Sequence, residues 1–179
     1  MAVAFELVAD FLSSEDDANR FAKLVEERLG PVAIDNFVVS LHPPLQSGYP
    51  YGAPTQFPVA VLPVNVGLCV ALDTAGERLQ LNESQIRRLG DHLYTLLSGL
   101  PYFKLAMVGW DVNFLLDIAT LRNEWEVEIR NGSFGGLVVA NDLLAKLPRS
   151  DHFTMFDDSH VWIPYLGSPS LNSEISTGE

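Results

Sequence analysis

The sequence predicts an α+β fold: one domain with a mainly antiparallel sheet and three to four helices packed on it. Residues 15–29 and 83–100 have the apolar spacing of amphipathic helices. About six to eight further segments are short, rich in Val, Ile and aromatic residues, and bounded by Gly, Pro, Asn or Asp. No internal repeat is present. We expect one domain over residues 1–167, with helices on one face of the sheet, and a flexible tail over residues 168–179.

The first segments read as a strand at residues 2–9, a helix at 15–29 and a strand at 32–41. Ser13 or Ser14 can cap the helix, and the acidic residues that follow meet the positive end of its dipole. Its apolar stripe consists of Ala18, Phe21, Ala22, Val25 and Leu29. Gly30 and Pro31 then form a stop signal.

Residues 43–58 form a long segment whose prolines and glycines predict a loop without regular structure. The segment is too apolar for a simple flexible linker, because it contains Tyr49, Tyr51 and Phe57. Two interpretations stay open. The segment is either a surface Ω-loop pinned by its own aromatic side chains or a binding element, such as the lid of a small-molecule pocket.

Residues 59–64 and 66–72 predict two strands, followed by a turn at residues 73–76. Asn82 with Gln85 has the pattern of a capping box that begins the second helix. The apolar stripe of that helix is Ile86, Leu89, Leu93, Leu96, Leu97 and Leu100. The residues around Gly99 end it.

The second half of the chain begins with a predicted strand at residues 102–108 and a turn at 109–111. Residues 113–130 are ambiguous, because their apolar positions fit a helix throughout but alternate like a strand near the end. We favour a helix, since the helical pattern covers the whole segment. A turn at residues 131–136 then leads back into the sheet.

The remaining expected elements are short. They are a strand at residues 137–140, a helix at 142–147 capped by Asn141, and extended segments at 153–156 and 161–165.

The charge of the chain bears on its partners. Eleven Lys and Arg against 23 Asp and Glu give a formal net charge of −12, while 47% of the residues are hydrophobic. This balance argues against nucleic acid, because neutralising phosphates requires clustered basic side chains. A basic protein is the opposite case, since long-range attraction accelerates its encounter with an acidic surface.

The sequence favours a cytoplasmic protein. No basic segment precedes an apolar run near Met1, as a secretory signal would require. No uncharged apolar run approaches the roughly 20 residues of a membrane span. Cys69 is the single cysteine, and its apolar neighbours predict a buried thiol in a reducing compartment.

Four residues form the tightest metal-like cluster of the sequence: His152, Asp157, Asp158 and His160. Imidazoles and carboxylates suit zinc or another divalent transition ion. The alternative is a solvated acidic turn, because the spacing matches no zinc signature. With an acid from Asp111 or Asp117, this segment is the basis of a second functional hypothesis, a metal-dependent hydrolase.

Other catalytic patterns are missing from the sequence. The serines lack the Gly-x-Ser-x-Gly elbow, and the glycines of residues 132–136 lack the lysine of a phosphate-binding loop. We therefore expect no cofactor and regard an enzyme as the weaker hypothesis.

The leading hypothesis is a cytosolic, non-enzymatic protein-binding domain with an acidic surface that carries aromatic side chains. Aromatic residues in acidic surroundings are suitable contacts for a basic partner. A small inhibitor or a toxin-neutralising immunity protein would have these traits. The candidate partner-binding residues are Trp110, Asp111, Glu124, Glu126, Glu128, Tyr49 and Tyr51.

Overall fold

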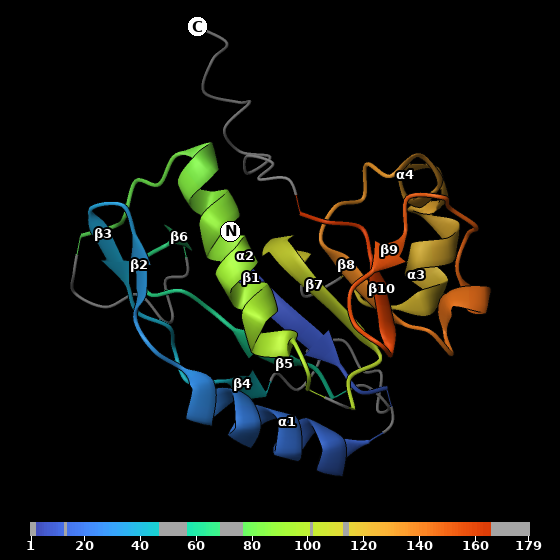
Figure 1. Cartoon of the computed structure of the whole chain (residues 1–179), viewed down its shortest axis with the longest axis horizontal. Coiled ribbons are helices and arrows are strands. Elements are labelled where there is room, and N and C mark those ends of the chain that lie inside the picture. Colours follow the sequence, from blue (N-terminus) through green and yellow to red (C-terminus); the bar gives the residue numbers. More distant parts are fainter. Residues whose placement is uncertain are drawn as a thin grey trace, which may run out of the picture.

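An antiparallel sheet runs through the computed structural model, with helices packed against it (Figure 1). The structure describes residues 3–12, 14–46, 57–68, 77–100, 102–112 and 115–165. Seven strands follow one another in the order β4-β5-β1-β7-β8-β10-β9, and β6 pairs with β1 off this path. Every pair of neighbours is antiparallel. The predicted α+β class is confirmed.

The elements have the following bounds. The strands of the main sheet are β1 (Val3–Asp10), β4 (Leu45–Gln46), β5 (Val59–Val61), β6 (Gly67–Leu68), β7 (Leu105–Trp110), β8 (Leu137–Ala140), β9 (Thr154–Met155) and β10 (His160–Trp162). A separate two-stranded sheet consists of β2 (Val32–Ile34) and β3 (Phe37–Val39). The helices are α1 (Glu15–Arg28), α2 (Glu83–Leu97), α3 (Ile118–Asn123), α4 (Glu126–Asn131) and the 3-10 helix η2 (Leu144–Lys146).

Helices cover both faces of the sheet, not one face as the sequence predicted. Phe5 and Leu7 of β1 belong to a buried cluster that includes the apolar stripes of α1 and α2. Val8 of the same strand belongs to a second cluster, with Leu121 of α3 and Ile129 of α4. Successive residues of a strand point to opposite faces, so β1 contributes to both cores. The sequence masks this arrangement because a strand buried on both faces loses its alternating pattern.

The two long helices confirm their predictions, because their caps are encoded locally. The Ser14 hydroxyl accepts a hydrogen bond from the Asp17 backbone N–H at the start of α1. At the start of α2, Asn82 and Gln85 form a reciprocal capping box with two hydrogen bonds of 3.0 Å. Both caps satisfy donors that a helix otherwise leaves unpaired.

The strand predicted at residues 32–41 is a β-hairpin instead. Asp35 has a φ of 51° and forms the turn between β2 and β3. Its carboxylate accepts hydrogen bonds from Gln85 and Arg88 of α2, and these contacts lower the pKa of Asp35. A side chain bonded to a distant helix thus stabilises a turn that local apolar spacing does not reveal.

The helix predicted over residues 113–130 is two short helices, α3 and α4. Asp117 caps α3 by accepting a hydrogen bond of 2.8 Å from the Thr120 N–H. The backbone leaves helical geometry at Trp125, where φ is −116° and ψ is 17°. Trp125 instead packs near Phe134, with 5.0 Å between ring centroids. Tertiary packing of this tryptophan therefore interrupts a pattern that fits one continuous helix.

The turn predicted at residues 109–111 lies later than expected. Strand β7 continues through Trp110, and the chain turns at Asp111, where φ is 52°. The Asp111 carboxylate accepts a hydrogen bond of 2.8 Å from the Ala4 N–H, which fixes this turn to β1.

Three further expectations need correction. The predicted helix at residues 142–147 is the shorter η2, and Asn141 does not cap it but donates to the Asp158 carbonyl oxygen. The loop predicted at 43–58 contains β4, which pairs with β5. The strand expected at residues 102–108 begins only at Leu105.

Several expectations fall on parts of the chain outside the described residues. They concern the loop tip at 47–56, Cys69, the turn at residues 73–76 and the tail at 168–179. Within the described ranges, the helices are all too short or too polar to cross a membrane.

Candidate functional site

A groove of about 560 Å³ opens where β7 begins and β8 ends. The first turn of α1 and the turn before β10 complete its walls. We call it the acidic groove. Its lining residues are Asp17, Tyr102, Phe103, Lys104, Ala140, Asn141, Asp142, Asp158, Ser159 and His160.

The floor of the acidic groove is a stacked pair of rings. The imidazole of His160 lies 4.0 Å from the ring of Phe103, with 10° between their planes. Its Nδ1 is 2.9 Å from the Asp157 carboxylate, and its Nε2 is 3.2 Å from the Phe103 carbonyl oxygen. Both ring nitrogens are thus engaged within the fold, and His160 is 3% exposed. This histidine stabilises the floor and presents no free nitrogen to a ligand.

The rim of the acidic groove is mainly acidic. Lys104 is its single lining cation among the described residues, and its Nζ lies 2.7 Å from Asp142. The hydrogen bond from Lys104 lowers the pKa of Asp142. Asp17 accepts a hydrogen bond from the Ser14 hydroxyl, while Asp158 is exposed. One cation against three carboxylates leaves the lining with an excess of negative charge.

Tyr102 is the aromatic residue of this rim, and it is 41% exposed. Its φ of 91° lies in the left-handed region, where a side chain with a Cβ is strained. Strained conformations of this kind cost on the order of 1–3 kcal/mol and cluster at functional sites. Tyr102 thus combines an exposed aromatic ring with a strained backbone at the rim of the acidic groove.

The four predicted metal ligands are not assembled into one site. His160 is held by Asp157 and Phe103, and Asp157 also accepts a hydrogen bond from the Ser159 N–H. Asp158 lines the acidic groove, whereas His152 is exposed and lies against Gly132. In the part of the chain that the structure describes, no three His, Cys, Asp or Glu side chains could hold a metal ion together.

The predicted partner-binding residues lie on different parts of the molecule. Trp110 packs against the cluster covered by α2, with its ring 5.3 Å from that of Phe5. Glu124, Glu126 and Glu128 lie on the α3–α4 segment, which covers the opposite face. Trp110 and these glutamates therefore do not share one surface.

The remaining predicted residues add little to a common surface. Glu126 is already paired with Arg130, at 2.6 Å. Asp111 is exposed, but its carboxylate is bonded to the backbone of Ala4. Tyr49 and Tyr51 lie outside the described residues.

Asp10 is a buried carboxylate at the end of β1, only 1% exposed. Its Oδ1 accepts a hydrogen bond of 3.0 Å from the Leu12 N–H, while Oδ2 has no hydrogen-bond partner among the described residues. Burial raises the pKa of Asp10 above its usual range. The charged form of this side chain thus destabilises the folded protein.

The Asp10→Asn variant tests how far the charged form of Asp10 destabilises the folded protein. Because the folded-state pKa of Asp10 is raised, the wild type loses stability as the pH rises through that pKa, whereas Asn does not titrate. We expect the variant to have the higher Tm at pH 7, with a difference that vanishes below about pH 4. Thermal unfolding of both proteins across pH 3–8 measures it. A difference that is constant with pH would contradict the assignment to Asp10.

Comparison of the chain with protein-family models, curated proteins and solved structures found no match.

Proposed function

We propose that this protein is a non-enzymatic protein-binding domain that takes a basic segment of a partner protein into the acidic groove. The observation that carries the proposal is the composition of this groove. It combines one exposed tyrosine with three carboxylates, and its only lining cation among the described residues is already paired with Asp142.

The groove has the chemistry that a Lys or Arg side chain requires. The face of an exposed aromatic ring attracts a cation, and Tyr102 supplies such a ring at the rim. Asp17 and Asp158 offer carboxylate oxygens to the same charge. The buried ring of Phe103 forms an apolar floor for the methylene groups of the entering side chain.

The charge of the whole chain supports the same partner class. A formal net charge of −12 attracts a basic protein at long range, and this attraction raises the association rate. The glutamates of the α3–α4 segment remain a prediction for a separate contact area. We favour the acidic groove over these glutamates because Arg122 and Arg130 place positive charge on the same two helices as Glu126, which is unfavourable for a basic partner.

The proposal includes a cytosolic location, which the presence of a single cysteine supports. A small inhibitor or a toxin-neutralising immunity protein is one class that would use an acidic groove in this way. Such a protein would cover the basic active site of its target.

Binding of fluorescein-labelled decalysine tests the groove. We expect Asp158→Asn and Tyr102→Ala each to weaken binding by about threefold to tenfold, or about 0.7–1.4 kcal/mol, as loss of one charge or one cation–π contact predicts. Fluorescence anisotropy at 50 mM and 300 mM NaCl measures the dissociation constants. The difference between variants and wild type should shrink at the higher salt concentration.

Glu124→Gln is the matched control, because it removes one exposed carboxylate from the α3–α4 segment and leaves the groove intact. Equal weakening in Glu124→Gln and Asp158→Asn would mean that decalysine responds to net charge only, and the groove would be rejected. Weakening in Glu124→Gln without any in Asp158→Asn would move the binding surface to α3 and α4.

A further inference from the structure

A second groove, of about 470 Å³, lies between the helices α3 and α4 and the turn that carries η2. Four of its lining residues are basic, although the whole chain has only 11 Lys and Arg. We call it the basic groove. Its lining residues are Arg122, Asn123, Glu126, Arg130, Ala145, Lys146, Leu147, Pro148 and Arg149.

Most of this positive charge is not neutralised within the protein. Arg130 is paired with Glu126, at 2.6 Å. Arg122 and Arg149 have neither an ion pair nor a side-chain hydrogen bond with any described residue, and Lys146 acts on the Asp142 carboxylate only at longer range. Four cations and one carboxylate give the lining a formal charge of +3, in a chain whose total is −12.

Stabilisation of helix ends explains part of this cluster. Arg122, Arg130 and Lys146 each lie in the last turn of a helix, where a positive charge meets the negative end of the dipole. Arg149 belongs to no helix, so this explanation does not apply to it. The convergence of three separate elements on one polar groove is also unexplained by local helix stability.

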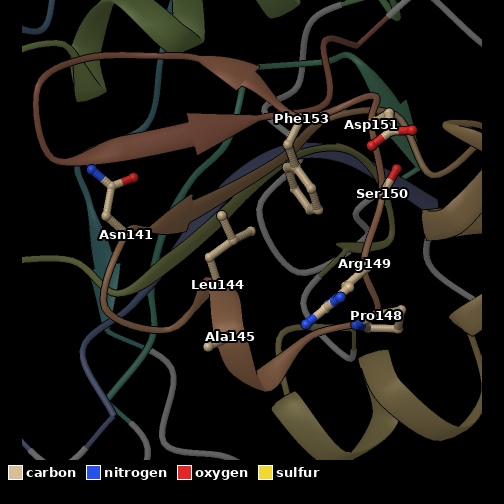
Figure 2. A pocket seen from close by; sticks show the side chains of 8 residues that line it. All are labelled: Asn141, Leu144, Ala145, Pro148, Arg149, Ser150, Asp151 and Phe153. Carbon is tan, nitrogen blue, oxygen red and sulfur yellow. The ribbon is translucent and has the colours of Figure 1, made fainter.

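A more apolar pocket of about 460 Å³ adjoins the basic groove, and Figure 2 shows the side chains around it. Leu144 and Phe153 are the largest apolar side chains that line it, so we call it the Phe153 pocket. Ala145, Pro148 and Arg149 line both this pocket and the basic groove. In Figure 2, the side chain of Arg149 extends across the pocket toward Ala145. Arg149 can therefore be reached from both sides.

We propose that these two neighbouring sites bind an organic phosphate. The phosphate lies in the basic groove, its apolar or aromatic part enters the Phe153 pocket, and Arg149 contacts the ligand where the two meet. A guanidinium group matches phosphate oxygens through paired hydrogen bonds. The three oxygens of a phosphate dianion can contact several cations from different elements at once. A carboxylate can be satisfied by one arginine, so it fits this set of cations less well.

This site is independent of the proposed protein-binding role. The basic groove and the acidic groove share no lining residue, and they favour ligands of opposite charge. The Phe153 pocket shares only Asn141 with the acidic groove, and neither proposal assigns a role in binding to this residue. Failure of one proposal therefore leaves the other unaffected.

Isothermal titration calorimetry with phenyl phosphate is the first test. We expect a dissociation constant of roughly 1 mM or below, and at least a tenfold loss of affinity in both Arg122→Gln and Arg149→Gln, since each variant loses charged hydrogen-bond donors to the phosphate. Arg87→Gln is the matched control, because Arg87 is exposed on α2 and lines neither site. This control should bind phenyl phosphate like the wild type.

Inorganic phosphate serves to separate the two parts of the site. Inorganic phosphate should bind to the wild type more weakly than phenyl phosphate does. Phe153→Ala should remove most of this difference by weakening the binding of phenyl phosphate, while the affinity for inorganic phosphate stays unchanged. Ala145→Glu places a carboxylate on the shared wall at an exposed position, which should not disturb folding. This variant should lose affinity for both probes.

Three results would overturn the proposal. The first is no heat of binding for phenyl phosphate at about 10 mM, a concentration at which the expected affinity gives near saturation. The second is an equal loss of affinity in Arg87→Gln and Arg149→Gln. The third is binding of polyglutamate that depends on Arg122, with no binding of phenyl phosphate, since the groove would then be a site for an acidic peptide.

Discussion

Replacement of Gly136 by alanine is expected to lower the Tm by on the order of 10 °C. Gly136 has a φ of 98°, which L side chains rarely adopt, and a Cβ at this position would lie 2.3 Å from the Val108 carbonyl oxygen. The left-handed conformation costs about 1–2 kcal/mol and overpacking a further 1–3 kcal/mol. For a domain of this size, each kcal/mol shifts the Tm by about 2–4 °C.

The backbone around Gly136 has little freedom to absorb the added methyl group. The Gly136 carbonyl oxygen accepts hydrogen bonds from the Tyr94 hydroxyl at 2.8 Å and from the Val108 N–H at 3.3 Å. Its N–H donates to the Ile163 carbonyl oxygen at 2.7 Å. A shift of this residue therefore strains its bonds to α2, to β7 and to the segment after β10 at once.

Gly99→Ala separates the two contributions. Gly99 also has a positive φ, 70°, but a Cβ there would meet no atom within 4 Å. We expect this control to lose only the conformational part, about 1–2 kcal/mol. Thermal and urea unfolding of both variants measure the difference. Equal destabilisation at the two positions would show that the contact with Val108 contributes nothing.

The sequence predicts best those elements whose determinants are local. The capping residues Ser14 and Asn82 and the apolar stripes behind them define α1 and α2 within one window of sequence. The hairpin turn at Asp35 and the break at Trp125 depend on contacts with residues far along the chain or on packing in the core. The local spacing of apolar residues indicates neither the turn nor the helix break.

The acidic groove could not be predicted for a similar reason. Its walls come from four separate segments, around residues 17, 102–104, 140–142 and 158–160, and only the fold brings them together. The sequence does single out Asp158 and His160, but as candidate metal ligands. Among the residues that line the acidic groove, Tyr102 is distinguished by its positive φ, which is a property of the backbone and has no signature in the local composition.

The basic groove shows how a total can conceal a local charge. A net charge of −12 argues against anionic ligands for the chain as a whole. Because α3, α4 and η2 converge, four cations that are spread over 28 positions, from Arg122 to Arg149, line one groove. Composition averages over the surface, whereas a small anion responds to the field within one groove.

Replacement of Phe103 by alanine is expected to destabilise the protein by about 3–5 kcal/mol, as for other buried phenylalanines. Phe103 is 1% exposed, and its ring lies between His160, at 4.0 Å, and Phe21, at 6.2 Å. Alanine leaves a cavity in the core and removes the ring on which the buried imidazole stacks. Urea unfolding at 25 °C measures the loss, with Phe103→Leu as the control at about 1 kcal/mol.

The same pair of variants connects the core to the acidic groove. Phe103 precedes Lys104 and follows Tyr102, so its packing fixes the backbone that presents both rim residues. Well below the Tm of each variant, Phe103→Ala should bind decalysine more weakly than the wild type, whereas Phe103→Leu should bind it equally well. Unchanged binding by a folded but destabilised Phe103→Ala would mean that the groove does not depend on its floor, and the orientation of Tyr102 would then have to come from the rim.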